Sequence, residues 1–339
     1  MPHLLPREHR FAHDYAIYLH DLVVGLLKRG AEAHVFDVTI EADQAEQALL
    51  QTLSGEALFD WIAENKDQRV SFEMDYKSVF AAVATDLCHF ALEGLRAAAK
   101  GKLTVAYALF RKPLCDDLFC LEWLLADPHD FLGKFRESSP RSIEIGSLEA
   151  TRRRAIVEEA VRLAGGPGVA ADRVYELRFD RASPASLARS WDQALHLVTT
   201  FKAIQTEPTN LNFVFSGRRE LETQWANVYW CVPYLLYHTS WIVDALFATI
   251  AMVDEEYAQE KWLRRAVGYE LWAEYGRRES PRRKLPQPLA ELLGGLRREC
   301  PSCSVLLAYH RRNLRCFVKH GSVLCSSCGN ATSPIAEHN

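Results

Sequence analysis

Apolar side chains recur at helical spacing along most of this chain, from Phe11 to about Tyr275. This periodicity predicts a mainly α fold in which helices form one bundle. We expect helices over residues 11–29, 43–64, 71–99, 102–126, 151–164, 185–204, 219–252 and 254–276. The chain has 339 residues, 48% of them hydrophobic and 25% charged, so it can bury a sizeable core. This composition excludes a disordered, collagen-like or fibrous protein.

Short alternating segments and turn residues interrupt the helical pattern. Residues 33–40, 174–179 and 211–215 alternate between apolar and polar side chains, which predicts strands of small hairpins on the helical body. Loop-forming residues at 137–147 and 165–168 separate a front half of the body from a back half.

The longest apolar run, residues 228–253, is long enough to cross a bilayer. It contains Pro233, His238 and Asp244, and an Asp near the middle of a span costs about 2.5–3.5 kcal/mol. We therefore expect a buried central helix and no membrane partner. The first eight residues lack the features of a secretory signal, which predicts a cytoplasmic protein.

Charge is divided unevenly along the chain. The net charge of −4 excludes a protein that coats nucleic acid with its whole surface. Residues 261–320 carry 14 basic and 5 acidic side chains, whereas residues 1–260 carry 26 and 38. The basic, proline-containing stretch 277–286 is typical of a linker or an arm. It predicts a helical domain over residues 1–285 and a second domain over residues 296–332.

Four of the nine cysteines form two Cys-x-x-Cys pairs with 21 residues between them, Cys300/Cys303 and Cys325/Cys328. Each spacing lets a tight turn direct two thiolates at one ion, and four thiolates complete the tetrahedral shell of a structural Zn²⁺. Zinc is the predicted cofactor, and an iron–sulfur cluster is the rarer alternative. Cys316 lies between the pairs and is expected to be an ordinary strand residue. The other four cysteines lie in apolar helical patterns and are predicted to be reduced and buried: Cys88, Cys115, Cys120 and Cys231.

The paired cysteines resemble those of a zinc ribbon, a small β fold that would cover about the last 35 to 40 residues. In such a ribbon residues 306–309 and 315–319 would pair as strands. A basic hairpin of this kind can contact nucleic acid. The alternatives are a solvated hairpin and a protein-docking module. The candidate nucleic-acid contacts are Arg311, Arg312, Arg315 and Lys319, with Tyr309 and Phe317 as stacking partners.

The predicted helix 103–126 is strongly apolar but carries Arg111 and Glu122, which are eleven residues apart and therefore on nearly one face. Pro113 should kink this helix. A buried guanidinium needs a partner, so we expect Glu122 or a charge on a neighbouring helix to pair with Arg111. His238 lies within the most apolar helix. It is either a hydrogen-bonded core histidine or a general base.

Residues 108–114 (ALFRKPL) and 234–240 (YLLYHTS) resemble segments of bacterial all-helical proteins of the HEPN type, which are related to abortive-infection proteins. In that family an Arg and a His separated by four to six residues form a metal-independent ribonuclease site at a dimer interface. Arg189 and His196 match this spacing, and on one helix they would share a face. The resemblance implies that Arg189 holds the scissile phosphate and that His196 transfers protons. Arg111 and His238 are second choices, and a structural role for His196 is the alternative.

The sequence therefore predicts a cytosolic, HEPN-like protein that engages RNA in a defence or toxin role, as a metal-independent endoribonuclease if it is an enzyme. The alternative is a non-enzymatic binding module. In that case the ribbon docks on nucleic acid or on a protein, and the helical body forms a homodimer.

Overall fold

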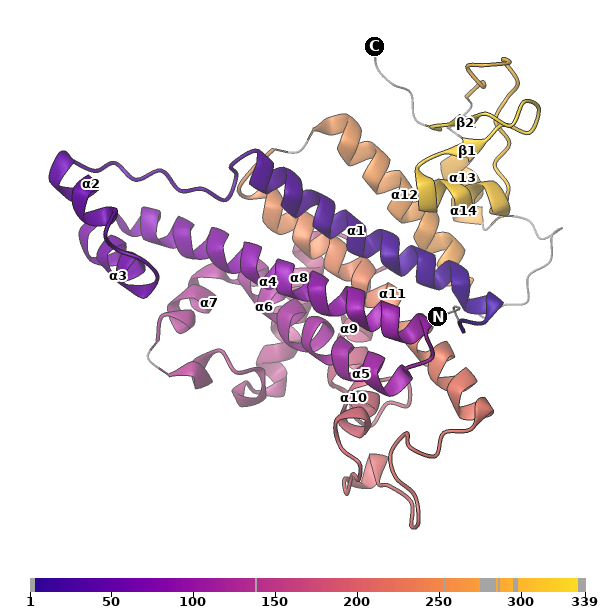
Figure 1. Cartoon of the computed structure of the whole chain (residues 1–339), viewed down its shortest axis with the longest axis horizontal. Helices are drawn as coiled ribbons and strands as arrows, with labels where there is room; N and C mark the ends of the chain where they lie inside the picture. Colours follow the sequence, from indigo (N-terminus) through magenta and orange to yellow (C-terminus); the bar gives the residue numbers. More distant parts are fainter. Residues whose placement is uncertain are drawn as a thin grey trace.

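Helices make up most of the chain, as the periodicity predicts (Figure 1). A computed structural model describes residues 4–137, 139–252, 254–274, 285, 287–294 and 298–334. Within them the only sheet has two short strands near the C-terminus, β1 (Val323–Leu324) and β2 (Ala331–Thr332), which pair antiparallel. The predicted fold class, mainly α with a small C-terminal β element, is confirmed.

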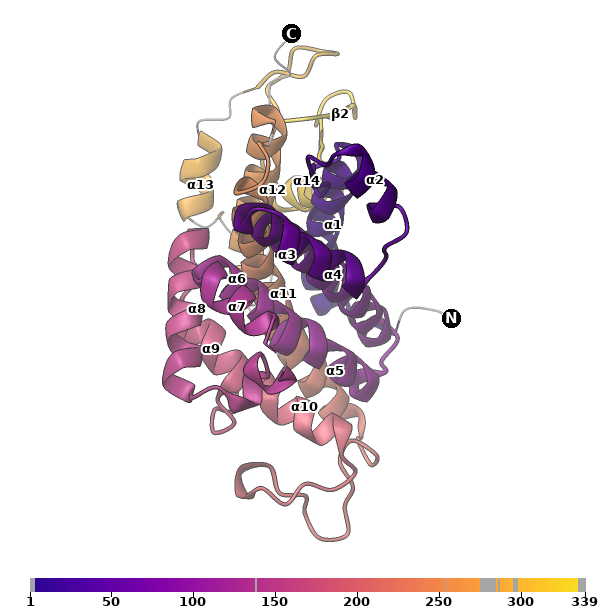
Figure 2. The ribbon, with the colours of Figure 1, turned by 90° about the vertical axis from the view of Figure 1, so that its left-hand side faces the viewer.

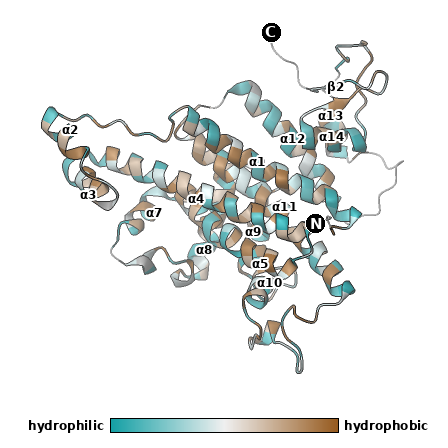
Figure 3. Ribbon diagram, in the orientation of Figure 1, coloured by the Kyte–Doolittle hydropathy of each residue, from teal (hydrophilic) through white to brown (hydrophobic). Residues whose placement is uncertain are grey.

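Four long helices organise the body: α1 (Arg10–Glu32), α4 (Gln68–Ala99), α11 (Arg218–Ala248) and α12 (Glu255–Ala273). Between Val228 and Phe247, α11 is buried on nearly all sides, and α1, α4 and α6 (Leu118–Ala126) pack around it. Hydrophobic and hydrophilic residues alternate along the ribbons of α1 and α12 in Figure 3, as expected for helices with one buried face. The longest apolar stretch of the sequence is therefore the centre of the bundle.

Shorter helices cover the remaining faces of this body. The helix α5 (Leu103–Arg111) lies against α4 and α10 (Leu187–Leu195), while α8 (Ala150–Ala164) and α9 (Ala171–Phe179) flank α6 and α11 (Figure 2). The loop between α10 and α11 projects from the body in both views. The other helical elements are η1 (Arg7–His9), α2 (Gln44–Leu50), α3 (Glu56–Asn65), η2 (Lys112–Asp117), α7 (Pro128–Phe135), η3 (Pro140–Ser142), η4 (Ile145–Ser147), η5 (Lys202–Ile204), α13 (Gln287–Gly294) and α14 (Arg311–His320).

The three strand predictions for the body are wrong. Residues 174–179 belong to α9, where Val174, Leu177 and Arg178 face inward at helical spacing. Packing of these residues against α8 and α11 favours a helix, although apolar and polar side chains alternate along the segment as in a strand. Residues 33–40 and 211–215 form turns and irregular backbone.

Three predicted helices are broken in the structure. Residues 43–64 divide into α2 and α3 at a turn where Gly55 has a φ of 57°. In the range 102–126, Pro113 lies in the π-helical turn η2, which joins α5 to α6 where the kink was expected. The predicted helix 185–204 ends at Leu195, and the Thr199 hydroxyl bonds the Ile204 carbonyl instead of supporting a helix.

The predicted linker, residues 277–286, lies outside the described residues apart from Leu285. By length and hydropathy, one helix of the described part of the chain, α4, could span a bilayer. In this structure it packs against α1, α5 and α6.

Candidate functional site

The four paired cysteines come together at the C-terminus, and their sulfur atoms all lie within 4.8 Å of one another. The Sγ atoms of Cys300 and Cys328 are 3.6 Å apart and those of Cys303 and Cys325 are 3.5 Å apart. Four thiolates at about 2.3 Å around one ion would lie roughly 3.8 Å from each other, so these spacings fit a tetrahedral metal site. Backbone N–H groups of residues 327 and 328 lower the pKa of Cys325 to about 6, which favours the thiolate. This cluster can bind a metal ion.

The segment between the two pairs is not a β hairpin, so that part of the ribbon prediction is wrong. Residues 311–320 form the helix α14, which starts at the N-cap His310 and ends at Gly321 in the left-handed conformation. Its buried side chains Leu314, Phe317 and Val318 follow helical spacing. Asn313 joins this helix to the segments on both of its sides, because its side-chain amide forms hydrogen bonds with the backbone of Ala308 before the helix and of Leu324 after it.

The basic residues of α14 mainly face the helical body. Arg311 forms an ion pair with Glu274, the residue that follows α12. The Arg315 guanidinium lies 5.0 Å from the centre of the Phe11 ring. Lys319 pairs with Asp14 at 3.2 Å, whereas Arg312 is exposed. Three of the four predicted nucleic-acid contacts therefore hold α14 against α1 and α12.

Glu122 is the centre of a fully buried charged cluster. The Arg178 guanidinium donates to both Glu122 carboxylate oxygens at 2.7 and 2.6 Å, and His238 Nε2 bonds Oε1 at 2.8 Å. Burial alone would raise the pKa of Glu122, but the charge of Arg178 and the bond from His238 outweigh it and lower the pKa. Arg178 also donates to the carbonyls of Leu114 and Cys115 in η2.

The expected Arg111–Glu122 pair is wrong. Arg111 is nearly half exposed and lies 3.5 Å from Asp116, because the π-helical turn shifts the register between Arg111 and Glu122. The buried guanidinium comes instead from Arg178, which sequence reasoning missed because residues 174–179 were interpreted as a strand. The cluster fixes α6, α9 and α11 against each other.

Asp117 is a second buried acid, at the end of η2. Its side chain is 8% exposed, and Asp86 of α4, which pairs with Lys112, lies beside it. Burial, followed by the negative charge of Asp86, raises the pKa of Asp117 to about 7. Asp117 therefore loses its proton only near neutral pH.

This proton should make stability depend on pH. The folded chain binds the proton of Asp117 more tightly than the unfolded chain, so the free energy of unfolding should fall as pH rises from about 4 to about 7. The slope is at most about 1.4 kcal/mol per pH unit. Urea unfolding at pH 5, 6, 7 and 8 checks this against Asp117→Asn, in which the contribution of Asp117 is lost and the fall in stability between pH 5 and 7 should be less steep than in the wild type. The exposed Asp60→Asn should keep the wild-type slope. Equal slopes in wild type and Asp117→Asn would contradict the assignment.

A pocket of about 520 Å³, which we call the Arg189 pocket, opens between α5, α10 and the start of α11. Its size is typical of small-ligand sites. Most of the residues that line it are polar: Tyr107, Pro184, Ser186, Arg189, Ser190, Gln193, Phe213, Arg219, Glu220, Thr223, Gln224 and Asn227.

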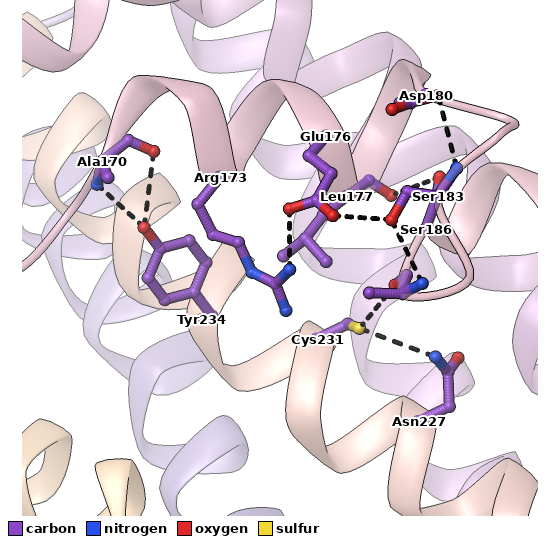
Figure 4. A network of polar contacts seen from close by, with 11 residues as sticks. Ala170, Arg173, Glu176, Leu177, Asp180, Ser183, Ser186, Asn227, Cys231 and Tyr234 are labelled. Atoms are coloured by element: carbon purple, nitrogen blue, oxygen red, sulfur yellow. Dashed lines mark hydrogen bonds and ion pairs between the residues drawn. The ribbon is translucent and has the colours of Figure 1, made fainter.

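Hydrogen bonds hold the wall of this pocket in place (Figure 4). Ser186 caps the start of α10 and also donates to the Leu177 carbonyl of α9. Across from it, the Cys231 thiol of α11 donates to the carbonyl of Ala185, and Asn227 donates to Cys231. Most of the lining therefore belongs to helices that the body fixes, whereas Pro184 and Phe213 come from the segments between helices.

The structure separates the four predicted catalytic residues. Arg189 lines the pocket, and its Nη2 donates to the Ala203 carbonyl at 2.6 Å. His196 is exposed beyond the end of α10 and does not line the pocket, so the expectation that both share one helix face is wrong. Arg111 is at the surface, and His238 is in the core with Glu122.

Comparison with known proteins gives no family for this chain, because no family model, curated protein or solved structure matches it.

Proposed function

We propose that this protein binds RNA through the Arg189 pocket, and that the four cysteines hold a structural zinc ion. The RNA-binding part of the proposal rests on two arginines that have no acidic partner in the described part of the chain. Within the described residues most guanidinium groups have acidic partners, but neither Arg189 nor Arg219 forms an ion pair, and both line this pocket. Two guanidiniums and the Ser190 hydroxyl suit a phosphate group, and the two positive charges outnumber the one carboxylate of the lining, Glu220.

The pocket favours binding over cleavage. Cleavage of the HEPN type would need His196 next to Arg189. In this structure Arg189 lines the pocket and His196 does not. The enzymatic version of the proposal keeps Arg189 as the phosphate contact and requires the 196–217 loop to bring His196 over the bound RNA. In the non-enzymatic version the loop does not move, and His196 stays outside the pocket.

The zinc part rests on the donor set. Four thiolates at tetrahedral spacing suit Zn²⁺, and no described group besides these four is needed to complete the shell. When bound, zinc would tie the turns at residues 300–303 and 325–328 together and so support α14 on the body. It takes no part in the proposed RNA contact.

Replacing Arg219 by alanine should weaken RNA binding about tenfold or more, since a charge-assisted hydrogen bond is worth about 1.5–3 kcal/mol. The affinity of the variant for RNA should also depend less on salt concentration, by the amount that one phosphate contact contributes. Fluorescence anisotropy with a labelled single-stranded RNA at two salt concentrations measures both, and Arg189→Ala should act in the same direction. Arg218→Ala is the matched control, because Arg218 is adjacent, exposed and paired with Glu222 outside the pocket.

The same RNA is then run on a denaturing gel, with and without brief EDTA treatment. Cleavage that resists EDTA and disappears in His196→Ala supports the enzymatic version. RNA that is bound but intact supports the binding module. If Arg219→Ala and Arg218→Ala bind RNA equally well, the pocket is not the RNA site.

A further inference from the structure

Phe213 is shared by two pockets. One is the Arg189 pocket, and the other is a second pocket of about 320 Å³ that Lys102 lines, which we call the Lys102 pocket. Phe213 and Gln224 line both pockets. The two hollows therefore meet at one aromatic ring, beside the start of α11.

The backbone of Phe213 is in a conformation that a bulky side chain seldom adopts. Its φ is 61°, in the left-handed region, where non-glycine residues are strained and cluster at binding sites. The surrounding structure holds it there. Its ring packs 5.6 Å from that of Tyr107, and its carbonyl accepts a bond from the Ser216 hydroxyl, which in turn accepts from Gln224.

Both pockets that Phe213 lines hold positive charge. Arg189 and Arg219 line one pocket, and the exposed Lys102 lines the other. Within the described chain Lys102 also forms no ion pair, as is true of the two arginines. An aromatic ring shared by two pockets, each with a cation that has no described acidic partner, suits the repeat of a nucleic-acid strand, in which a base lies between two phosphates.

We propose that the two pockets form one groove for a single strand of nucleic acid, with a base stacked on Phe213 and the flanking phosphates at Arg189/Arg219 and at Lys102. This inference rests on the proposed RNA binding and names its ligand class. In a duplex each base is already stacked between its neighbours, so its face is not available to Phe213. The groove should therefore select single strands over duplexes.

The test measures binding of a labelled single-stranded 12-mer RNA, its DNA counterpart and a 12-base-pair duplex by anisotropy. Phe213→Ala should weaken binding of the single strands about 5- to 140-fold, the range found for loss of one stacked base. Phe213→Leu should weaken binding in the same way, and Phe213→Trp should retain it. Phe215→Ala is the matched control, because Phe215 is 69% exposed on the same loop and lines neither pocket. Thermal unfolding of each variant checks the fold.

The outcomes separate this inference from the proposed function. If the wild type binds no RNA, both fail. If Arg219→Ala weakens binding but Phe213→Ala and Phe213→Leu bind like the wild type, RNA binding stands and the stacking groove is overturned. Equal affinity for duplex and single strand would also overturn it. Selective loss of single-strand binding in both Phe213 variants, with Phe215→Ala unchanged, supports the groove.

Discussion

Purified protein should contain one zinc ion per chain, and Cys328→Ser should lose it together with the order of residues 298–334. Zinc binding contributes about 10–16 kcal/mol to the folding of small cysteine-ligated units. The unit described here has only two strands of two residues and one helix of ten, too little structure to fold without such a link. Without the metal, the apolar face of α14 should leave α1 and α12.

Metal analysis of the purified protein and hydrogen exchange of residues 298–334 measure the two parts of this result. Cys316→Ser is the control, because Cys316 lies on α14 in the same unit but outside the cluster, and it should keep its zinc and its exchange protection. Full zinc content in Cys328→Ser, or iron in place of zinc in the wild type, would contradict the assignment.

Replacing Glu122 by glutamine should destabilise the protein by about 3–5 kcal/mol, because the substitution leaves the fully buried Arg178 without a counter-charge. The bond from His238 is weakened at the same time. Equilibrium unfolding in urea measures the loss. Glu93→Gln is the control, since Glu93 and its partner Arg96 are exposed and the change should stay within about 0.5 kcal/mol.

A double variant separates loss of the ion pair from general damage. In Glu122→Gln with Arg178→Met no unpaired charge remains, so the double variant should be more stable than the sum of the two single losses predicts. Additive losses, or a loss below about 1 kcal/mol in Glu122→Gln, would show that the cluster does not hold α6, α9 and α11 together.

The sequence predicted best where one pattern extends over many residues. The apolar run at α11 and the periodic stretches at α1 and α4 gave helices close to the observed ones, because each buries a broad face that local turns cannot override. The Cys-x-x-Cys pairs likewise showed that four sulfurs meet, since their spacing is itself the geometry of the turn.

Short segments were predicted poorly because their structure depends on distant contacts. Residues 174–179 alternate like a strand, yet burial of Arg178 against Glu122 makes them helical. At α14 the signals were present, in the N-cap His310, the helical spacing of Leu314 and Phe317, and Gly321, but the ribbon resemblance favoured strands.

The Arg189 pocket was also beyond sequence reasoning, apart from Arg189 itself. Its residues come from α5, α10 and α11, which are separated by up to about a hundred residues and meet only in the folded body. Phe213 lies in the 196–217 loop and Arg219 follows it, and this position could have drawn attention to both residues, since loops on a rigid scaffold often carry function.

The contacts of α1 have a consequence for synthesis on the ribosome. Tyr15 near the start of the chain donates to the carbonyl of Arg265, and Asp14 pairs with Lys319, 305 residues later. At about 5–20 residues per second the ribosome needs roughly 12 to 50 seconds to add the residues that separate Tyr15 from its partner. During that interval α1 can pack on α4, which is complete at residue 99, but the part of its apolar face that α11 and α12 cover stays exposed. The newly made chain should therefore need chaperones until its last third emerges.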